Sequence, residues 1–119
     1  CYLWRERTLY QLSRDHSLQE QLIVEQQLSP AQARAHPAAN ALTRAIGADE
    51  PVALEVLELT HNPGDVFLLC SDGLYQALSH AELGQALSLA TPESMLDRLF
   101  DGVLRGEARD NLTAVVIKP

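Results

Sequence analysis

The chain has 119 residues, of which 46% are hydrophobic and 21% charged, enough apolar material for one folded domain with its own core. Its formal net charge of −7 argues against a nucleic-acid partner, because binding to a phosphate backbone depends on clustered lysine and arginine. Two cysteines are too few for a disulfide framework, which favours a cytoplasmic setting. No window approaches the roughly 20 consecutive apolar residues that a membrane span requires.

The chain opens inside a β-prone run rather than at a methionine. Residues 1–4 and 8–12 are rich in strand-forming side chains, and the polar residues between them have the length of a hairpin loop. Because Cys1 already lies within an expected strand, we expect this chain to be a fragment of a longer protein.

Helix signals come next. Residues 17–20, Ser-Leu-Gln-Glu, form a capping box that predicts a helix over residues 18–27. Residues 29–30, Ser-Pro, predict a second, alanine-rich helix through Arg34, which has little apolar bulk and should lie loosely on the surface. Residues 40–46 fit either a short helix or a strand, and their periodicity does not choose between the two.

Two strands are predicted in the middle of the chain. Apolar residues alternate over residues 52–59 with one change of parity, which indicates a strand with a bulge. Residues 62–65, Asn-Pro-Gly-Asp, predict a type II turn. The apolar run of residues 66–70 then has the length of a buried strand, and it delivers Asp72 to the rim of a sheet.

The C-terminal part predicts two helices and a last strand. Ser79 and Glu82 form another capping box, and residues 91–93 begin the final helix. That helix has the clearest apolar stripe of the chain, which we expect in the core: Leu96, Leu99, Phe100, Val103 and Leu104. Residues 112–117 are apolar at both parities, so the strand they predict should be covered on both faces.

Two aspartates lie at the ends of predicted strands. Asp72 follows residues 66–70, and Asp110 precedes residues 112–117, so the two carboxylates meet if these strands are antiparallel neighbours. Paired carboxylates suit Mg²⁺ or Mn²⁺, which prefer oxygen ligands. The alternative is that both are turn residues that cap nearby N–H groups, and Asp-Gly is a common turn dipeptide. The strand pattern alone favours the turn interpretation.

Four stretches, in this order, resemble bacterial members of the metal-dependent, type 2C-like (PPM) protein serine/threonine phosphatases. They are residues 10–17 (YQLSRDHS), 36–47 (HPAANALTRAIG), 64–79 (GDVFLLCSDGLYQALS) and 104–117 (LRGEARDNLTAVVI). Together they cover essentially the whole chain.

The resemblance implies an α+β fold, part of a four-layer α-β-β-α sandwich with mainly antiparallel sheets, of which residues 1–119 are the C-terminal portion of one catalytic domain. It implies two Mn²⁺ or Mg²⁺ ions and a bridging water that attacks phosphoserine or phosphothreonine in a protein. Asp72 and Asp110 would be ligands of one ion. Asn111 and Gly73 would shape the ligand loops, and residues 21–35 resemble a mobile flap near the substrate groove.

The family's other metal ligands, its phosphate-binding arginine and its acid histidine belong to segments before Cys1. Two hypotheses follow: the parent protein is an active phosphatase that opposes a serine/threonine kinase, or a catalytically dead relative that serves as a regulatory or binding module. The chain alone should be inactive, bind metal weakly and self-associate through open strand edges.

The remaining polar candidates have a functional and a structural interpretation. His16 beside Asp15 could be a metal or acid–base pair, although the resembling segment is structural in the family. Arg44 could reach a phosphate, but a structural salt bridge is the commoner role for such an arginine. The other histidines, His36, His61 and His80, fall at loop, turn and helix-start positions and are not expected to bind a ligand.

Overall fold

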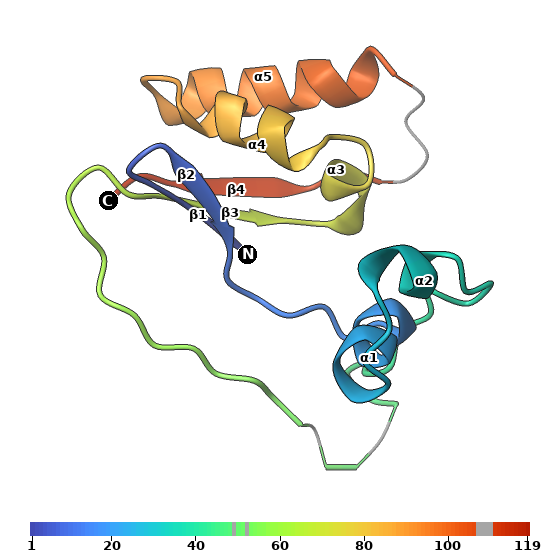
Figure 1. The fold of residues 1–119 in the computed structure, drawn as a ribbon. Coiled ribbons are helices and arrows are strands. Elements are labelled where there is room, and N and C mark those ends of the chain that lie inside the picture. Colours follow the sequence, from blue (N-terminus) through green and yellow to red (C-terminus); the bar gives the residue numbers. More distant parts are fainter. Residues whose placement is uncertain (49, 52, 107–110) are drawn as a thin grey trace. The chain divides into compact units, whose positions relative to one another are not determined.

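The computed structural model describes residues 1–48, 50–51, 53–106 and 111–119. They form two compact units, one of residues 1–13 and 59–119 and the other of residues 14–58. The elements, labelled in Figure 1, are β1 (Tyr2–Arg5), β2 (Thr8–Gln11), α1 (Leu18–Glu25), α2 (Pro30–Arg34), β3 (Val66–Cys70), α3 (Asp72–Tyr75), α4 (His80–Leu87), α5 (Pro92–Leu104) and β4 (Ala114–Ile117).

The first unit contains a four-stranded sheet in the order β2-β1-β3-β4, and every neighbouring pair is antiparallel. The predicted hairpin is confirmed, with Arg5 opposite Thr8. Its turn residues Glu6 and Arg7 both have positive φ, 50° and 63°, as a two-residue hairpin turn requires even without glycine. The predicted α+β class with antiparallel pairing is confirmed.

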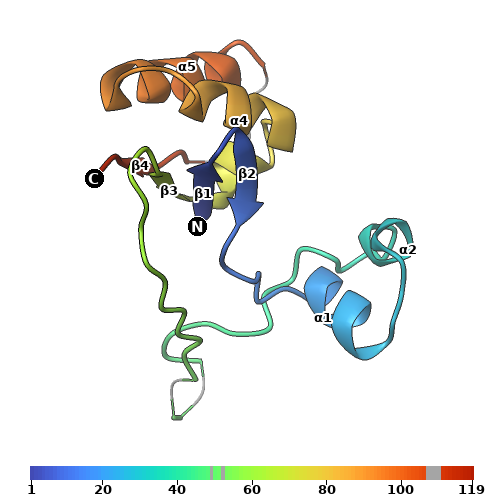
Figure 2. The same ribbon diagram turned by 60° about the vertical axis from the view of Figure 1, so that its left-hand side comes forward.

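Helices α4 and α5 pack on one face of this sheet (Figure 2). Val66 and Leu68 of β3 point to that face and are buried. The predicted capping box of α4 is confirmed for Ser79 and Glu82, and the predicted start of α5 is confirmed by its cap, Thr91. At α1, Ser17 accepts from the Glu20 amide as predicted, which is one half of the expected box. These local signals explain why these helices begin where the sequence indicates.

The predicted apolar stripe of α5 is partly wrong. Its buried centre is Met95, Leu99 and Val103, spaced four residues apart, whereas Leu104 is 68% exposed. Because each residue turns the helix by about 100°, Leu104 lies well to the side of the row that Val103 ends. The helix therefore contributes a narrower stripe to the core than the sequence suggested.

The other face of the sheet is partly open in this unit. Leu69, Val115 and Ile117 are 45%, 49% and 43% exposed. The prediction that residues 112–117 are covered on both faces is thus wrong among the described residues, where burial alternates along β4. The reason is that α4 and α5 cover one face only.

The second unit contains α1, α2 and irregular segments. The predicted helix over residues 18–27 ends at Glu25, and residues 40–46 form neither helix nor strand apart from an isolated bridge between Ser17 and Leu42. The alanine-rich helix is held more firmly than predicted, because Ala33 is fully buried.

The strand predicted over residues 52–59 is wrong for its described part, since residues 53–61 belong to no helix or strand. Val56 and Leu57 are 81% and 60% exposed. The alternating pattern shows that these side chains suit a β-sheet. A strand also needs a neighbouring strand to pair with its backbone groups, and no described strand is paired with this segment.

Among the described residues, no helix combines the length and hydropathy needed to cross a bilayer.

Candidate functional site

The end of β3 and the start of β4 lie at the same edge of the sheet. The ladder pairs Cys70 with Ala114, and one further contact follows, in which the Ser71 amide donates to the Thr113 carbonyl at 2.9 Å. The Thr113 amide donates in return to Ser71 Oγ at 3.0 Å. The antiparallel arrangement on which the predicted carboxylate pair depends is therefore confirmed.

Asp72 is the first residue of α3, directly after this edge, and its side chain is exposed. The buried strand before it and the buried Leu74 after it hold its backbone in place. An exposed carboxylate at a strand end is an oxygen donor of the kind that Mg²⁺ and Mn²⁺ prefer. Asp72 thus fits the role of one metal ligand.

Asp110, the other predicted ligand, lies outside the described residues, so its meeting with Asp72 stays a prediction. Within residues 1–48, 50–51, 53–106 and 111–119, no group of three or more His, Cys, Asp or Glu side chains could hold a metal ion.

A third aspartate, Asp65, has a structural role. Arg5 donates to both of its carboxylate oxygens, at 2.9 and 2.7 Å, and the Asn62 amide donates at 2.7 Å. Asp65 is only 2% exposed, yet hydrogen bonding from Arg5 and then from Asn62 outweighs the effect of burial and lowers its pKa to about 2. This charge pair fixes the turn that leads into β3.

No local pattern marks this ion pair, because Arg5 lies far from Asp65 in the chain and meets it only through the pairing of β1 with β3. The turn itself is as predicted, with Gly64 at a φ of +87°.

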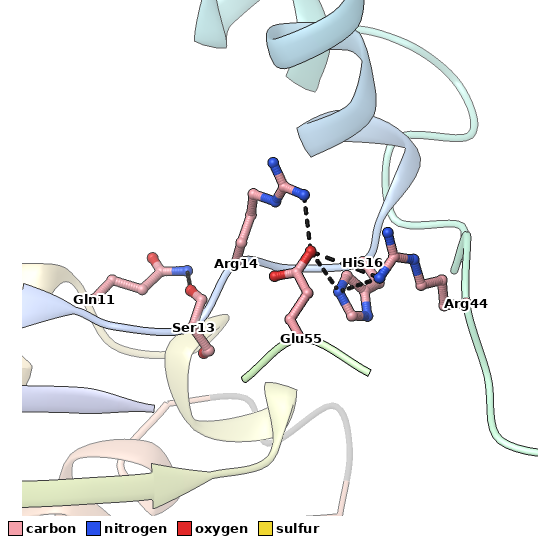
Figure 3. A network of polar contacts seen from close by, with 6 residues as sticks. All are labelled: Gln11, Ser13, Arg14, His16, Arg44 and Glu55. Carbon is pink, nitrogen blue, oxygen red and sulfur yellow. Dashed lines mark hydrogen bonds and ion pairs between the residues drawn. The ribbon is translucent and has the colours of Figure 1, made fainter. Parts of the chain in front are cut away.

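The second unit holds a cluster of charged side chains, drawn in Figure 3. One oxygen of Glu55, Oε1, lies 2.8 Å from Arg14 Nη2, 3.3 Å from His16 Nε2 and 3.6 Å from Arg44 Nη1. Hydrogen bonding from Arg14 is the main cause that lowers the pKa of Glu55. The structural salt bridge considered for Arg44 is present.

Sequence reasoning missed Glu55, because it treated residues 52–59 as a strand and weighed only their apolar positions. It also missed Arg14, although Arg14 lies in one of the four family-like stretches. Two of the other histidines make structural contacts. His80 Nε2 lies 2.8 Å from the carbonyl of Leu9, 71 residues away in the chain, and His36 Nδ1 accepts from the nearby Ala38 amide at 3.1 Å.

A family model described as stage II sporulation protein E (SpoIIE) matches residues 20–119. The chain belongs to this SpoIIE and PPM-type phosphatase family. PstP of Mycobacterium tuberculosis, a serine/threonine protein phosphatase, is 34% identical over 116 residues, which are 97% of this chain and 22% of that protein. The family resemblance of the four ordered stretches is thereby confirmed.

Solved structures agree with this membership. The PPM Ser-Thr phosphatase MsPP of Mycobacterium smegmatis, in complex with cacodylate, superposes with a TM-score of 0.85 at 32% identity and covers 98% of this chain and 50% of its own. The catalytic domain of PstP in complex with two manganese ions superposes with a TM-score of 0.72 at 34% identity, covering 97% and 47%. This PPM-type chain spans less than half the length of the curated relatives it matches.

Proposed function

We propose that the protein to which this chain belongs hydrolyses phosphoserine and phosphothreonine in proteins with the help of Mn²⁺ or Mg²⁺. The observation that carries the proposal is the antiparallel pairing of β3 and β4 in a PPM-type chain, because it puts Asp72 and the segment leading into β4 at one edge of the sheet. The relatives named as protein serine/threonine phosphatases support the same reaction.

Residues 1–119 are proposed to be the C-terminal portion of a single catalytic domain. The share of each relative that the chain spans supports this assignment, since it is 47% for the Listeria monocytogenes phosphatase stp. On this proposal the remaining metal donors, and the second sheet of a four-layer α-β-β-α sandwich, come from the N-terminal portion.

Asp72 and Asp110 are the proposed ligands of one ion in this chain. When bound, a pair of such ions lowers the pKa of a coordinated water and screens the charge of the phosphoryl group. The chain's own contribution is positional. Ser71 joins the two strands through its backbone and its hydroxyl, and buried Leu68 anchors β3, so the backbone that carries Asp72 is fixed before any ion arrives.

The proposed substrate is a phosphorylated protein, and the proposed counterpart is a serine/threonine kinase that supplies it. We place both in the cytoplasm, which suits a chain of 119 residues with only two cysteines. The 119-residue chain by itself is proposed to be inactive, because two carboxylates make one incomplete site.

The test uses the full-length protein and synthetic phosphoserine and phosphothreonine peptides. Phosphate release should require Mn²⁺ or Mg²⁺, stop when a chelator is added and return when metal is restored. Release that persists in excess chelator would contradict the proposal. No release with either metal would instead favour the catalytically dead regulatory module.

A further inference from the structure

The cluster around Glu55 has the composition of an anion-binding site whose anion is already present. Two guanidinium groups, from Arg14 and Arg44, and the imidazole of His16 converge on a single carboxylate oxygen (Figure 3). Guanidinium groups match the geometry of carboxylates and phosphates, and two of them on one oxyanion are typical of recognition sites for such groups.

The backbone segments that carry Arg14, His16 and Arg44 are hydrogen-bonded to each other without any contribution from Glu55. The Thr43 amide donates to the His16 carbonyl at 2.9 Å, and the Leu18 amide donates to the Ala41 carbonyl at 2.8 Å. These bonds join the entrance of α1 to the segment that carries Arg44. The three side chains therefore stay near one another when the carboxylate leaves.

Glu55, by contrast, lies in a segment that has few packing contacts to hold it in place. Residues 53–58 belong to no helix or strand, and the neighbours Leu54 and Val56 are 75% and 81% exposed. The side chains of Arg14, Arg44 and Glu55 are 49%, 42% and 39% exposed, and ion pairs this exposed to water contribute little to stability. An anion from outside can therefore compete with Glu55 for the three side chains.

We propose that Arg14, His16 and Arg44 form an oxyanion subsite that Glu55 occupies in the free protein and that an acidic or phosphorylated side chain of a bound polypeptide takes over. The identity of this ligand rests on the proposed function, because a phosphoprotein substrate supplies such side chains. The subsite itself rests only on the geometry of the cluster.

The residues around this subsite lower its affinity for free anions. The adjoining concavity, of about 240 Å³, is also lined by Asp15, Glu20 and Glu25. These acids repel free anions, so the intrinsic affinity of the cluster for an oxyanion is low. A polypeptide held elsewhere on the protein presents that group at high effective concentration, which offsets a weak intrinsic affinity.

The first experiment titrates inorganic phosphate into the full-length protein in excess chelator and follows the side-chain NMR signals of Arg14, His16 and Arg44. If Glu55 fills the subsite about four-fifths of the time, Glu55→Gln should bind phosphate about fivefold more tightly than the wild type. Glu58→Gln, a matched change three residues away in the same segment, should bind like the wild type. Arg44→Gln should weaken binding in the wild-type and Glu55→Gln backgrounds alike.

An equal phosphate affinity in Glu55→Gln and the wild type would overturn the proposal. That result would mean that Glu55 only pins its segment, and faster amide exchange over residues 53–58 in the variant would accompany it. Because the titration contains no metal and measures no hydrolysis, its result is independent of whether the protein proves to be a phosphatase.

A second arm identifies the source of the oxyanion with three unlabelled peptides that differ at one residue: glutamate, phosphoserine or glutamine. Tighter binding of the glutamate or the phosphoserine peptide to Glu55→Gln than to the wild type supports the subsite, and the better of the two names its ligand. Equal binding of all three peptides would contradict it.

Discussion

Leu99 lies at the centre of the core beneath α5 and is fully buried, so its truncation measures how much that core contributes. Leu99→Ala removes three carbons, worth about 0.8 kcal/mol each, or about 2.4 kcal/mol of lost transfer free energy. The cavity left between α5, α4 and the sheet adds to this, and we expect a total loss of about 3 to 4 kcal/mol in the free energy of unfolding.

The matched control is Leu104→Ala in the same helix. Leu104 is 68% exposed, so the same chemical change should alter the free energy of unfolding by about 0.5 kcal/mol or less. Urea denaturation followed by far-ultraviolet circular dichroism gives both values. Equal losses in the two variants would refute the placement of the core on the row of Met95, Leu99 and Val103.

Three further changes test other parts of the structure. Hydrogen bonding from Arg5 lowers the pKa of Asp65 from 3.8 to about 2, so this carboxylate stabilises the fold above pH 3.8 and that stabilisation is lost as pH falls towards 2. The urea midpoint of Asp65→Asn should therefore vary less than that of the wild type over this window, and identical profiles would contradict the pairing. Ser79→Ala removes the cap of α4 and should cost about 1 kcal/mol in the same assay, whereas no loss would show that the capping box is unimportant. The 119-residue chain alone should form larger species with rising concentration in light scattering, because the face with Leu69, Val115 and Ile117 is open, and a stable monomer would argue against this.

Elements with a signal in their own residues were predictable from the sequence. The Pro-Gly turn before β3 and the caps at Ser29, Ser79 and Thr91 lie where the sequence indicates. Each depends on contacts within a few residues, such as a hydroxyl that accepts from an amide three positions later. The antiparallel pairing of β3 with β4, a contact between distant segments, was expected only as a condition for the two carboxylates to meet.

Features that depend on a distant partner were not predictable in this way. The alternation over residues 52–59 indicates side chains that suit a sheet, but the described part of that segment has no neighbour to pair with and stays irregular. Glu55 binds Arg14 and Asp65 binds Arg5, 41 and 60 residues away in the chain, so no local pattern marks these two ion pairs. The exposure of one face of β4 likewise depends on which elements cover the sheet.

The candidate site likewise has parts that the sequence predicted and parts that only the structure revealed. The motif Ser-Asp-Gly after a buried run predicted where Asp72 lies, at the sheet rim directly after β3. Its role as a metal ligand came from the family resemblance and stays a prediction, as does its partnership with Asp110. The cluster of Arg14, His16 and Arg44 around Glu55 became visible only in the structure.

The metal site is best tested by Mn²⁺ titration calorimetry of full-length Asp72→Asn, run beside a phosphopeptide assay. Asp97→Asn, an exposed change on α5, serves as the control. We predict that Asp72→Asn loses most of its Mn²⁺ affinity and its metal-dependent phosphate release, while Asp97→Asn keeps both. Wild-type Mn²⁺ binding and turnover in Asp72→Asn would contradict the proposed metal site at the edge of the sheet.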